Sequence, residues 1–294
     1  MSALDDHALA ADLAERAGHL LLTLRARGGD PDALRNAGDR QSHEFLMAEL
    51  AKARPDDAVL SEEGIDDKAR LTADRVWIVD PLDGTREFGE PGRSDWAVHV
   101  ALWARHTSAP PEQWPATRAA AASAEELSGT RTAGAGNLIA GAVALPAQNR
   151  VLSTVAEPTP QADGGAERSD RTPPGPGAQR PLRMVVSRSR ASNLVKDVAK
   201  RLNAELVKCG SAGAKVATVV LGENDVYLHS GGFYEWDTAA PVAVARQRGF
   251  HVSRIDGSPV VYNQRDPLLP DILVCRPAIA PVLLNAIREA THAI

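Results

Sequence analysis

The sequence predicts an α/β fold in which helices are layered on β-sheets. In the second half of the chain, short apolar strands alternate with segments of helical periodicity, a pattern typical of helices packed on a sheet. The chain has 294 residues, 44% of them hydrophobic, so it can bury a large core in one domain or two smaller ones. Because the alternation begins after Pro181, we divide the chain into an α+β half, 1–181, and an α/β half, 182–294.

Helices and strands are mixed in the first half. Leucines at helical spacing predict a helix over 7–27, which Gly28-Gly29 ends. A second helix is predicted over 40–53, before Pro55. His99 falls in a predicted strand and is interpreted as a strand residue rather than a ligand. Strands are predicted at 58–60, 75–79 and 96–104, and a hairpin at 138–145 and 150–154.

The second half follows the alternation more regularly. Two segments, 106–136 and 156–181, are rich in Ala, Ser, Thr, Pro, Gly or charged residues and are interpreted as long surface loops. The first lies between two predicted strands, 96–104 and 138–145. The predicted strands are 182–187, 205–208, 225–229, 250–254 and 272–275, and the predicted helices are 191–204, 213–221, 238–248 and 278–292.

The composition of the chain limits which partners and which cellular compartment are expected. A net charge of −5 leaves no basic face for a nucleic-acid polymer. The two cysteines, Cys209 and Cys275, are too few for a disulfide framework. The N-terminus lacks a secretory pattern, and no apolar run approaches the length of a membrane span. We therefore expect a cytoplasmic protein with no membrane partner.

The run from Val76 to Thr85 carries the main chemical signal. Its four apolar residues predict a buried strand that stops at Asp80-Pro81, and Asp83 precedes Gly84-Thr85, where a helix can start. Asp80 and Asp83 can thus aim oxygens at a common point, next to the free N–H groups of the helix. Two hard oxygen ligands beside a phosphate seat favour Mg²⁺-dependent phosphate chemistry. Alternatively, the same residues form an ordinary solvated turn.

Further acids stand where a metal site would need them. Glu62 and Glu63 end a short apolar strand, and Asp237 lies at the start of a predicted helix. Asp237 could instead be only the N-cap of that helix, although a carboxylate with two oxygens can cap a helix and bind a metal at once. Glu63 is interpreted as solvated or as a support for the site.

Three of these segments together resemble the signatures of the inositol monophosphatase superfamily. They are Leu60–Glu63, Asp80–Phe88 and Glu235–Ala240, and two further loops, Gly210–Lys215 and Asp256–Pro259, are similar to family loops. Glu87-Phe88 after Gly-Thr, together with Ser-Glu-Glu and Glu-Trp-Asp-Thr-Ala, most resembles the CysQ branch, the 3'(2'),5'-bisphosphate nucleotidases. The resemblance implies a layered αβαβα sandwich with the site in the cleft between its halves.

The resemblance also implies a metal site. Glu62, Asp80 and the carbonyl of Leu82 would hold one Mg²⁺, and Asp80, Asp83 and Asp237 a second, with two or three ions per site. Mn²⁺ could replace Mg²⁺, and Li⁺ would inhibit.

Family positions further imply catalytic and phosphate-binding groups. Thr85 and Asp39, with the metal-bound Glu62, would act on the attacking water. The N–H groups of Gly84 and Thr85 would hold the scissile phosphate, beside Asp83 and Asp237. Asp39 departs from the usual sequence context of the family, so it could equally be the N-cap of helix 40–53.

Substrate recognition is implied for five residues of the second half. Ser187 and Arg188 resemble a family loop near the nucleotide, Gly210 and Ser211 a loop contacting the sugar, and Lys215 could meet a second phosphate.

The implied activity is hydrolysis of adenosine 3',5'-bisphosphate to AMP and phosphate, and also of 3'-phosphoadenylyl sulfate, in sulfur assimilation. An inositol-1-phosphatase or fructose-1,6-bisphosphatase with the same metal chemistry, and a non-catalytic nucleotide or phosphate sensor, are the alternatives. Superfamily members are often dimers, so a homodimer is also expected.

Overall fold

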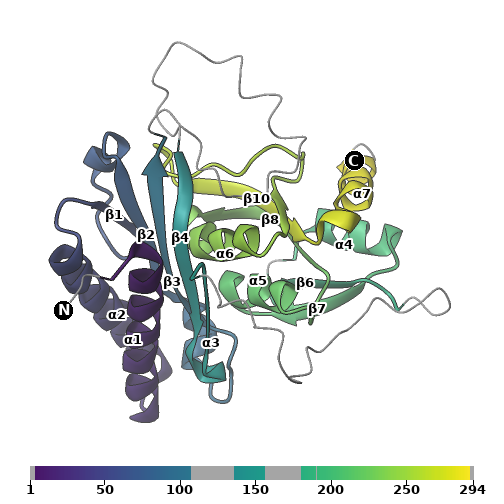
Figure 1. The fold of residues 1–294 in the computed structure, drawn as a ribbon. Coiled ribbons are helices and arrows are strands. Elements are labelled where there is room, and N and C mark those ends of the chain that lie inside the picture. The colour runs from purple at the N-terminus through teal and green to yellow at the C-terminus, as the bar shows by residue number, and fades with distance from the viewer. Residues whose placement is uncertain (1–3, 107–135, 156–179, 190, 292–294) are drawn as a thin grey trace, which may run out of the picture.

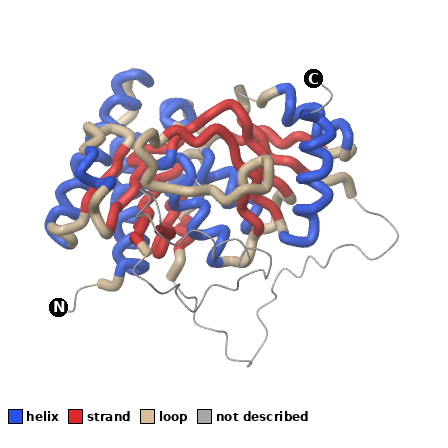
Figure 2. The backbone as a smooth tube through the Cα atoms, turned by 90° about the horizontal axis from the view of Figure 1, so that it is seen from above, coloured by secondary structure: helices blue, strands red, loops and turns tan. Residues whose placement is uncertain are grey.

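The protein is described by a computed structural model that covers residues 4–106, 136–155, 180–189 and 191–291. Two five-stranded sheets lie side by side, and helices pack on both faces of each sheet (Figure 1). Seen from above, helices again flank the strands of both sheets (Figure 2). The layers follow the order helix, sheet, helix, sheet, helix, so the expected αβαβα sandwich is confirmed.

The first sheet is built by the N-terminal part of the chain. Its strand order is β1-β2-β3-β4-β5, with β1 parallel to β2 and every other pair antiparallel. Helices α1 and α2 cover its outer face, because their leucines, Leu13 and Leu46 among them, are fully buried against the strands. The elements are α1 (Asp6–Ala26), α2 (Pro31–Ala53), β1 (Ala58–Ser61), β2 (Arg75–Asp83), α3 (Thr85–Gly89), β3 (Ala97–Arg105), β4 (Gly136–Leu145) and β5 (Arg150–Ser153).

The second sheet follows in sequence and has the order β7-β6-β8-β10-β9. Strand β6 is parallel to β7 and β8, whereas β10 is antiparallel to both its neighbours. Helices α4 and α7 close its outer face. The elements are β6 (Arg183–Ser187), α4 (Asn193–Arg201), β7 (Glu205–Cys209), α5 (Ala212–Val220), β8 (Val226–Tyr234), α6 (Glu235–Gln247), β9 (His251–Ser253), β10 (Leu268–Cys275) and α7 (Ala280–Thr291).

Helices α5 and α6 lie between the two sheets and contact both of them. Their alanines and valines are almost entirely buried, in a core shared by strands of each sheet. Residues near the ends of β6, β7 and β8 therefore lie close to the end of β2 and the start of α3.

Three predicted boundaries are wrong near the motifs. Helix α2 begins at Pro31 rather than at residue 40, since Asp30 caps it by accepting from the Ala33 N–H. Strand β2 does not stop before Pro81 but continues to Asp83, with its pairing to β3 shifted between Asp80 and Asp83. Helix α6 begins at Glu235 and contains Pro241.

The other predicted helices, strands and the hairpin are found, with ends that differ by a few residues. The two predicted surface loops, 106–136 and 156–181, lie almost wholly outside the described residues. Each sheet takes its strands from one side of residue 181, and the division into two domains stays a prediction. Among the described helices, none is long and apolar enough to cross a membrane.

Candidate active site

A cavity of about 510 Å³ brings together the acids that the sequence singled out. Both sheets contribute to it, because its lining comes from the ends of β1, β2 and β6, from α3, from β8, and from the segments that follow β7 and β8. Glu62, Asp80, Asp83 and Asp237 all line this one cavity, together with Leu82, Gly84, Thr85, Ser187, Arg188, Gly210, Ser211 and Lys215.

The irregular end of β2 sets the conformation of the segment from Asp80 to Gly84. The Asp80 side chain accepts a hydrogen bond from the Leu82 N–H at 3.0 Å, and the Ser42 hydroxyl donates to the Pro81 carbonyl at 2.7 Å. Gly84 then takes a left-handed conformation with φ 87°, and an added Cβ would lie only 3.1 Å from the Ser211 Cβ. A glycine is therefore required where the strand turns into α3.

Protein groups contact one carboxylate oxygen of Asp83. Its Oδ2 accepts from the Gly213 N–H of α5 at 2.8 Å and lies 3.2 Å from His99 Nε2. The same imidazole contacts the Trp236 carbonyl through Nδ1, at 3.1 Å. His99 is a strand residue, as predicted, but its contacts with Asp83 and with the residue before Asp237 were not predicted.

Glu62 and Asp237 come from different elements of the fold. Glu62 follows β1, and its N–H donates to the Val79 carbonyl at 3.4 Å, which places it beside the end of β2. Asp237 stands in the first turn of α6, where its Oδ2 accepts from the Tyr234 N–H at 2.6 Å. The alternative interpretation of Asp237 as the N-cap is wrong, because Tyr234 occupies that position. The carboxylate nevertheless supports the helix start and lines the cavity at once.

The closeness of the carboxyl groups and their burial raise the pKa of two of these acids. Burial, together with repulsion from Glu62, Asp83 and Asp237, raises the pKa of Asp80. Burial and the neighbouring Asp237 raise the pKa of Glu62 to about 7. Four carboxylates and the Leu82 carbonyl form an all-oxygen donor set, which suits a hard divalent cation that would relieve the repulsion. Asp80, Asp83 and His99 each offer a ligand atom within 4.8 Å of the other two, and Glu62 and Asp237 line the same cavity. These described residues thus fit a metal site.

Thr85 and Asp39 meet beside this cluster. The Thr85 hydroxyl lies 3.2 Å from Asp39 Oδ1 and 3.0 Å from the Leu82 carbonyl. Asp39 is not the N-cap of α2 but lies inside that helix, one turn before Ser42. Burial and the nearby Glu63 raise the pKa of Asp39 to about 6. The alternative interpretation of Asp39 as a helix cap is therefore wrong.

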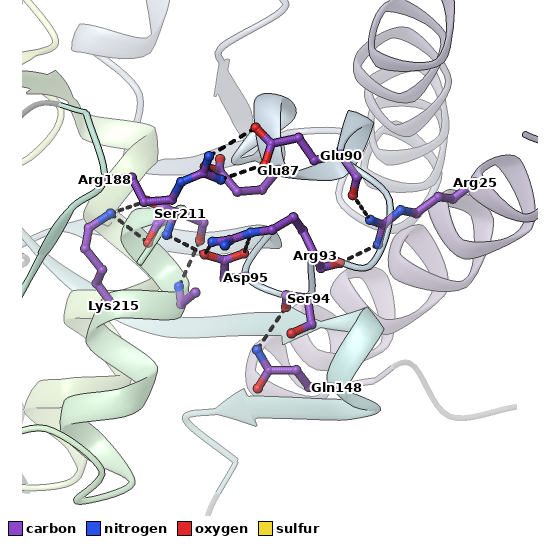
Figure 3. Close-up of polar contacts among 12 residues, drawn as sticks. Arg25, Glu87, Glu90, Arg93, Ser94, Asp95, Gln148, Arg188, Ser211 and Lys215 are labelled. Carbon is purple, nitrogen blue, oxygen red and sulfur yellow. Dashed lines mark hydrogen bonds and ion pairs between the residues drawn. The ribbon is translucent and has the colours of Figure 1, made fainter. Parts of the chain in front are cut away.

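The five predicted substrate residues of the second half of the chain line the same cavity. Arg188, Ser211 and Lys215 among them make contacts with protein groups (Figure 3). One guanidinium nitrogen of Arg188 donates at 2.9 Å to both Glu87 and Glu90. The Gly210 N–H donates at 2.6 Å to Asp95, and the Ser211 N–H to the Asp95 carbonyl at 3.1 Å. These contacts join α3 and the loop after it to the second sheet.

Lys215 supports the same loop from beneath. The side chain is 4% exposed, its ammonium donates to the Ser211 carbonyl at 2.9 Å and also to the Gly210 carbonyl, and it lies 5.5 Å from the centre of the Tyr227 ring. Lys215 therefore contributes positive charge to the cavity wall while it fixes the backbone of the loop.

Three aromatic side chains of the cavity wall were missed in the sequence. Tyr227, His229 and Phe233 come from β8, and the His229 and Phe233 rings lie 4.7 Å apart with their planes inclined by 32°. The spacing of Tyr227 and His229 puts both on one face of a strand. Spacing alone could not show that this face borders a cavity.

A buried network holds the start of α6. Glu235 accepts from the backbone N–H groups of Asn263 and Gln264, at 2.6 and 2.7 Å. The wholly buried Arg70 donates to the Asn263 side chain at 2.7 Å and to Asp66 at 2.6 Å. The turn that carries Asp237 is thus tied to the segment after β1.

Comparison with known proteins finds sequence relatives and solved structures of the same fold. A 3'-phosphoadenosine 5'-phosphate phosphatase of Mycobacterium leprae is 47% identical over 97% of this chain and 94% of its own length. The crystal structure of CysQ from Bacteroides thetaiotaomicron is 27% identical, with a TM-score of 0.64 over 92% of this chain and 96% of that chain. Inositol monophosphatase II of Staphylococcus aureus, at 19% identity, shares the fold with a TM-score of 0.69 over 97% of this chain and 96% of that chain. The sequence model of the inositol monophosphatase family matches residues 8–109 and 132–292. The chain therefore belongs to the inositol monophosphatase family.

Proposed function

We propose that this protein is a Mg²⁺-dependent phosphomonoesterase that hydrolyses adenosine 3',5'-bisphosphate to AMP and phosphate. The observation that carries the proposal is the convergence of four carboxylates, from segments far apart in the sequence, on one cavity. The similarity to 3'-phosphoadenosine 5'-phosphate phosphatases and to CysQ supports the choice of substrate.

The acids divide between two cation positions. Glu62, Asp80 and the Leu82 carbonyl would hold one Mg²⁺, and Asp80, Asp83 and Asp237 the second, with Asp80 shared. When bound, such cations lower the pKa of water and neutralise phosphoryl oxygens. Few protein oxygens per ion are needed, since Mg²⁺ usually keeps several waters.

Thr85 and Asp39 would orient the attacking water. The single proton of the Thr85 hydroxyl has two acceptors, the Leu82 carbonyl at 3.0 Å and Asp39 Oδ1 at 3.2 Å. With the Leu82 carbonyl on a cation, the hydroxyl would donate its hydrogen bond to ionised Asp39. The lone pairs of Thr85 are then free to accept from a water in the cavity. The backbone of Gly84 and Thr85 borders the same space, in a position to hold a phosphate.

The opposite wall would recognise the nucleotide. Arg188 and Lys215 bring positive charge to it, alongside Ser187, Gly210 and Ser211. The rings of β8 add an aromatic surface, which favours a purine nucleotide over a polyhydroxylated ring such as inositol because a base can stack on it.

We also propose that the protein hydrolyses 3'-phosphoadenylyl sulfate and acts in sulfur assimilation. Mn²⁺ would substitute for Mg²⁺, Li⁺ would inhibit, and the protein would form a homodimer. A cytoplasmic location is supported by Cys209 and Cys275, which are both buried and unpaired.

A parallel assay of phosphate release tests the proposal. Adenosine 3',5'-bisphosphate, 3'-phosphoadenylyl sulfate, inositol 1-phosphate and fructose 1,6-bisphosphate would be compared with Mg²⁺, with and without Li⁺. We expect the adenosine bisphosphate to give the highest kcat/KM and Li⁺ to lower it. A preference for inositol 1-phosphate or fructose 1,6-bisphosphate by more than about tenfold, equal to about 1.4 kcal/mol, would overturn the choice of substrate.

A matched variant separates a loss of catalysis from a loss of folding. Asp83→Asn keeps the shape of the side chain but removes its charge, so it should abolish turnover and leave the thermal unfolding of the protein largely unchanged. If the wild type with Mg²⁺ is as inactive on all four substrates as this variant, the protein is not a phosphatase of this group.

A further inference from the structure

Asp95 connects the segment after α3 to the loop after β7, part of which lines the cavity (Figure 3). Its Oδ2 accepts from the Gly210 N–H at 2.6 Å, and its backbone carbonyl accepts from the Ser211 N–H at 3.1 Å. Gly210 and Ser211 belong to the cavity lining, whereas Asp95 does not. Asp95 therefore supports this loop without facing the cavity itself.

The first half of the chain holds Asp95 in place. Arg93 Nε donates to Asp95 Oδ1 at 2.8 Å, and a second nitrogen of the same guanidinium donates to Oδ2. Arg25 of α1 donates to the Arg93 carbonyl at 2.6 Å and to the Glu90 carbonyl at 2.5 Å. The segment from Glu90 to Asp95 is thus bound to α1, and Asp95 extends this connection to the second sheet.

Lys215 binds the carbonyls of the same loop. Its ammonium donates to the Ser211 carbonyl at 2.9 Å and also to the Gly210 carbonyl. Asp95 and Lys215 together therefore bind both N–H groups and both carbonyls of Gly210 and Ser211. Since each N–H carries a single proton, neither is left for a substrate. This backbone would contact a substrate by packing against it, so its position decides the fit.

The loop also packs directly against the turn at Gly84, which would hold the scissile phosphate. A Cβ added to Gly84 would lie 3.1 Å from the Ser211 Cβ, and one added to Gly210 would lie 2.5 Å from the Glu87 side chain. A shift of Gly210 and Ser211 would therefore change the space between this turn and the second sheet.

From these contacts we infer that Asp95 is a positioning residue for substrate binding. It fixes Gly210 and Ser211 relative to the turn at Gly84, so that the cavity fits the nucleoside of a substrate whose phosphate lies at that turn. The inference rests on the proposed function, because it requires a nucleotide substrate. Asp95 should affect binding of the nucleoside more than binding of the phosphate, since its hydrogen bonds go to Arg93 and to the loop.

Steady-state kinetics with adenosine 3',5'-bisphosphate and Mg²⁺ test the inference, with inorganic phosphate as a competitive inhibitor. KM depends on binding of the whole nucleotide, whereas the Ki of phosphate depends on the phosphate position alone. Asp95→Ala removes the side-chain acceptor, and Asp95→Asn keeps an oxygen that can accept from the Gly210 N–H. Asp5→Ala is the matched control, because Asp5 also accepts from a backbone N–H, that of Ala8 at 2.7 Å, outside the cavity lining. Circular dichroism and thermal unfolding show that each variant is folded.

We expect Asp95→Ala to raise KM by about tenfold, with kcat and the Ki of phosphate within about twofold of the wild type. Asp95→Asn should recover most of the loss, and Asp5→Ala should match the wild type. An unchanged KM in Asp95→Ala would overturn the inference, and so would a parallel rise of KM and of the Ki of phosphate, or no recovery in Asp95→Asn. If the wild type does not hydrolyse the bisphosphate, the proposed function fails and the inference fails with it. A failure of the inference alone leaves wild-type turnover intact, so the two failures are distinguishable.

Discussion

At the scale of single residues, short motifs identified the acids but not their supports. Asp80, Asp83 and Asp237 each stand beside turn or helix-start residues, so their local sequence is informative. His99 gave no such signal, because its contacts with Asp83, Gly213 and Trp236 form only in the folded chain. Long-range contacts of this kind have no local signature, and the aromatic wall of β8 was missed for the same reason.

Asp39 should control the acid limb of the pH profile. Asp39→Asn removes the negative charge that draws the Thr85 hydroxyl into its hydrogen bond, so kcat should fall by about 100-fold or more with little change in KM. In the wild type the pKa of Asp39 is raised to about 6, so activity should fall as the pH drops below that value. Steady-state kinetics between pH 5 and 8 check both expectations.

Glu63 provides the control for this prediction. Its charge helps to raise the pKa of Asp39, so Glu63→Gln should move the acid limb to lower pH while activity near pH 8 is retained. An Asp39→Asn variant with wild-type kcat would exclude Asp39 from the reaction.

Phe233 should contribute to recognition of the base. Phe233→Leu keeps an apolar side chain but removes a ring that borders the cavity. We expect the KM for adenosine 3',5'-bisphosphate to rise by about tenfold, since stacking of a base on an aromatic ring is worth about 1–3 kcal/mol. Phe45→Leu, on α2 under Arg16, is the matched control. Similar KM values in both variants would remove β8 from substrate recognition.

At the scale of elements, the positions of helices and strands were predictable but their ends near the site were not. Helix α2 and helix α6 begin earlier than predicted, and β2 runs on through Pro81. Helix α2 begins early because Asp30 caps it locally, whereas at β2 and α6 a tertiary contact overrides the local signal. The Ser42 hydroxyl binds the Pro81 carbonyl, and Glu235 binds the segment at 263–264.

The network behind α6 should be important for stability. Arg70→Leu removes a fully buried guanidinium and leaves polar partners unpaired, so the free energy of unfolding should fall by about 3–5 kcal/mol. Lys68→Ala is the matched control: Lys68 pairs with the same Asp66, but its side chain is 54% exposed. That change should cost less than about 1 kcal/mol. Denaturant unfolding measures both variants, and equal losses would show that the buried network has no special role.

At the scale of the whole molecule, the layered fold was predictable because the alternation of elements and the resemblance agreed. The meeting of two sheets at one cavity was expected only from the resemblance, since no local pattern specifies how β2 and α6 approach each other. The structure brings the four acids together and adds the inward-facing rings, the Arg188 ion pairs and the network behind α6.

The acid cluster should make the metal-free protein less stable at higher pH. A carboxyl group whose pKa is raised on folding stabilises the fold while it is protonated. For Glu62, with an ordinary pKa of 4.5 and a folded value of about 7, this contribution is complete below pH 4.5 and is lost as the pH rises through 7. Metal-free protein should therefore unfold at a lower Tm at pH 8 than at pH 6.

Mg²⁺ should remove most of this difference, because a bound cation replaces the protons. Glu62→Gln, which cannot ionise, should show a smaller dependence on pH without metal. Differential scanning calorimetry at both pH values measures these effects. A metal-free Tm that rises from pH 6 to pH 8, with no effect of Mg²⁺, would contradict the assignment of these carboxylates to a metal site.

The most direct measurement is anomalous diffraction from a crystal soaked in Mn²⁺. The proposed site predicts anomalous density within coordinating distance of both Asp80, in β2, and Asp237, in α6. Density that is absent from this position, or that contacts only one of the two carboxylates, would contradict the claim that separate segments of the chain converge on one divalent-cation site.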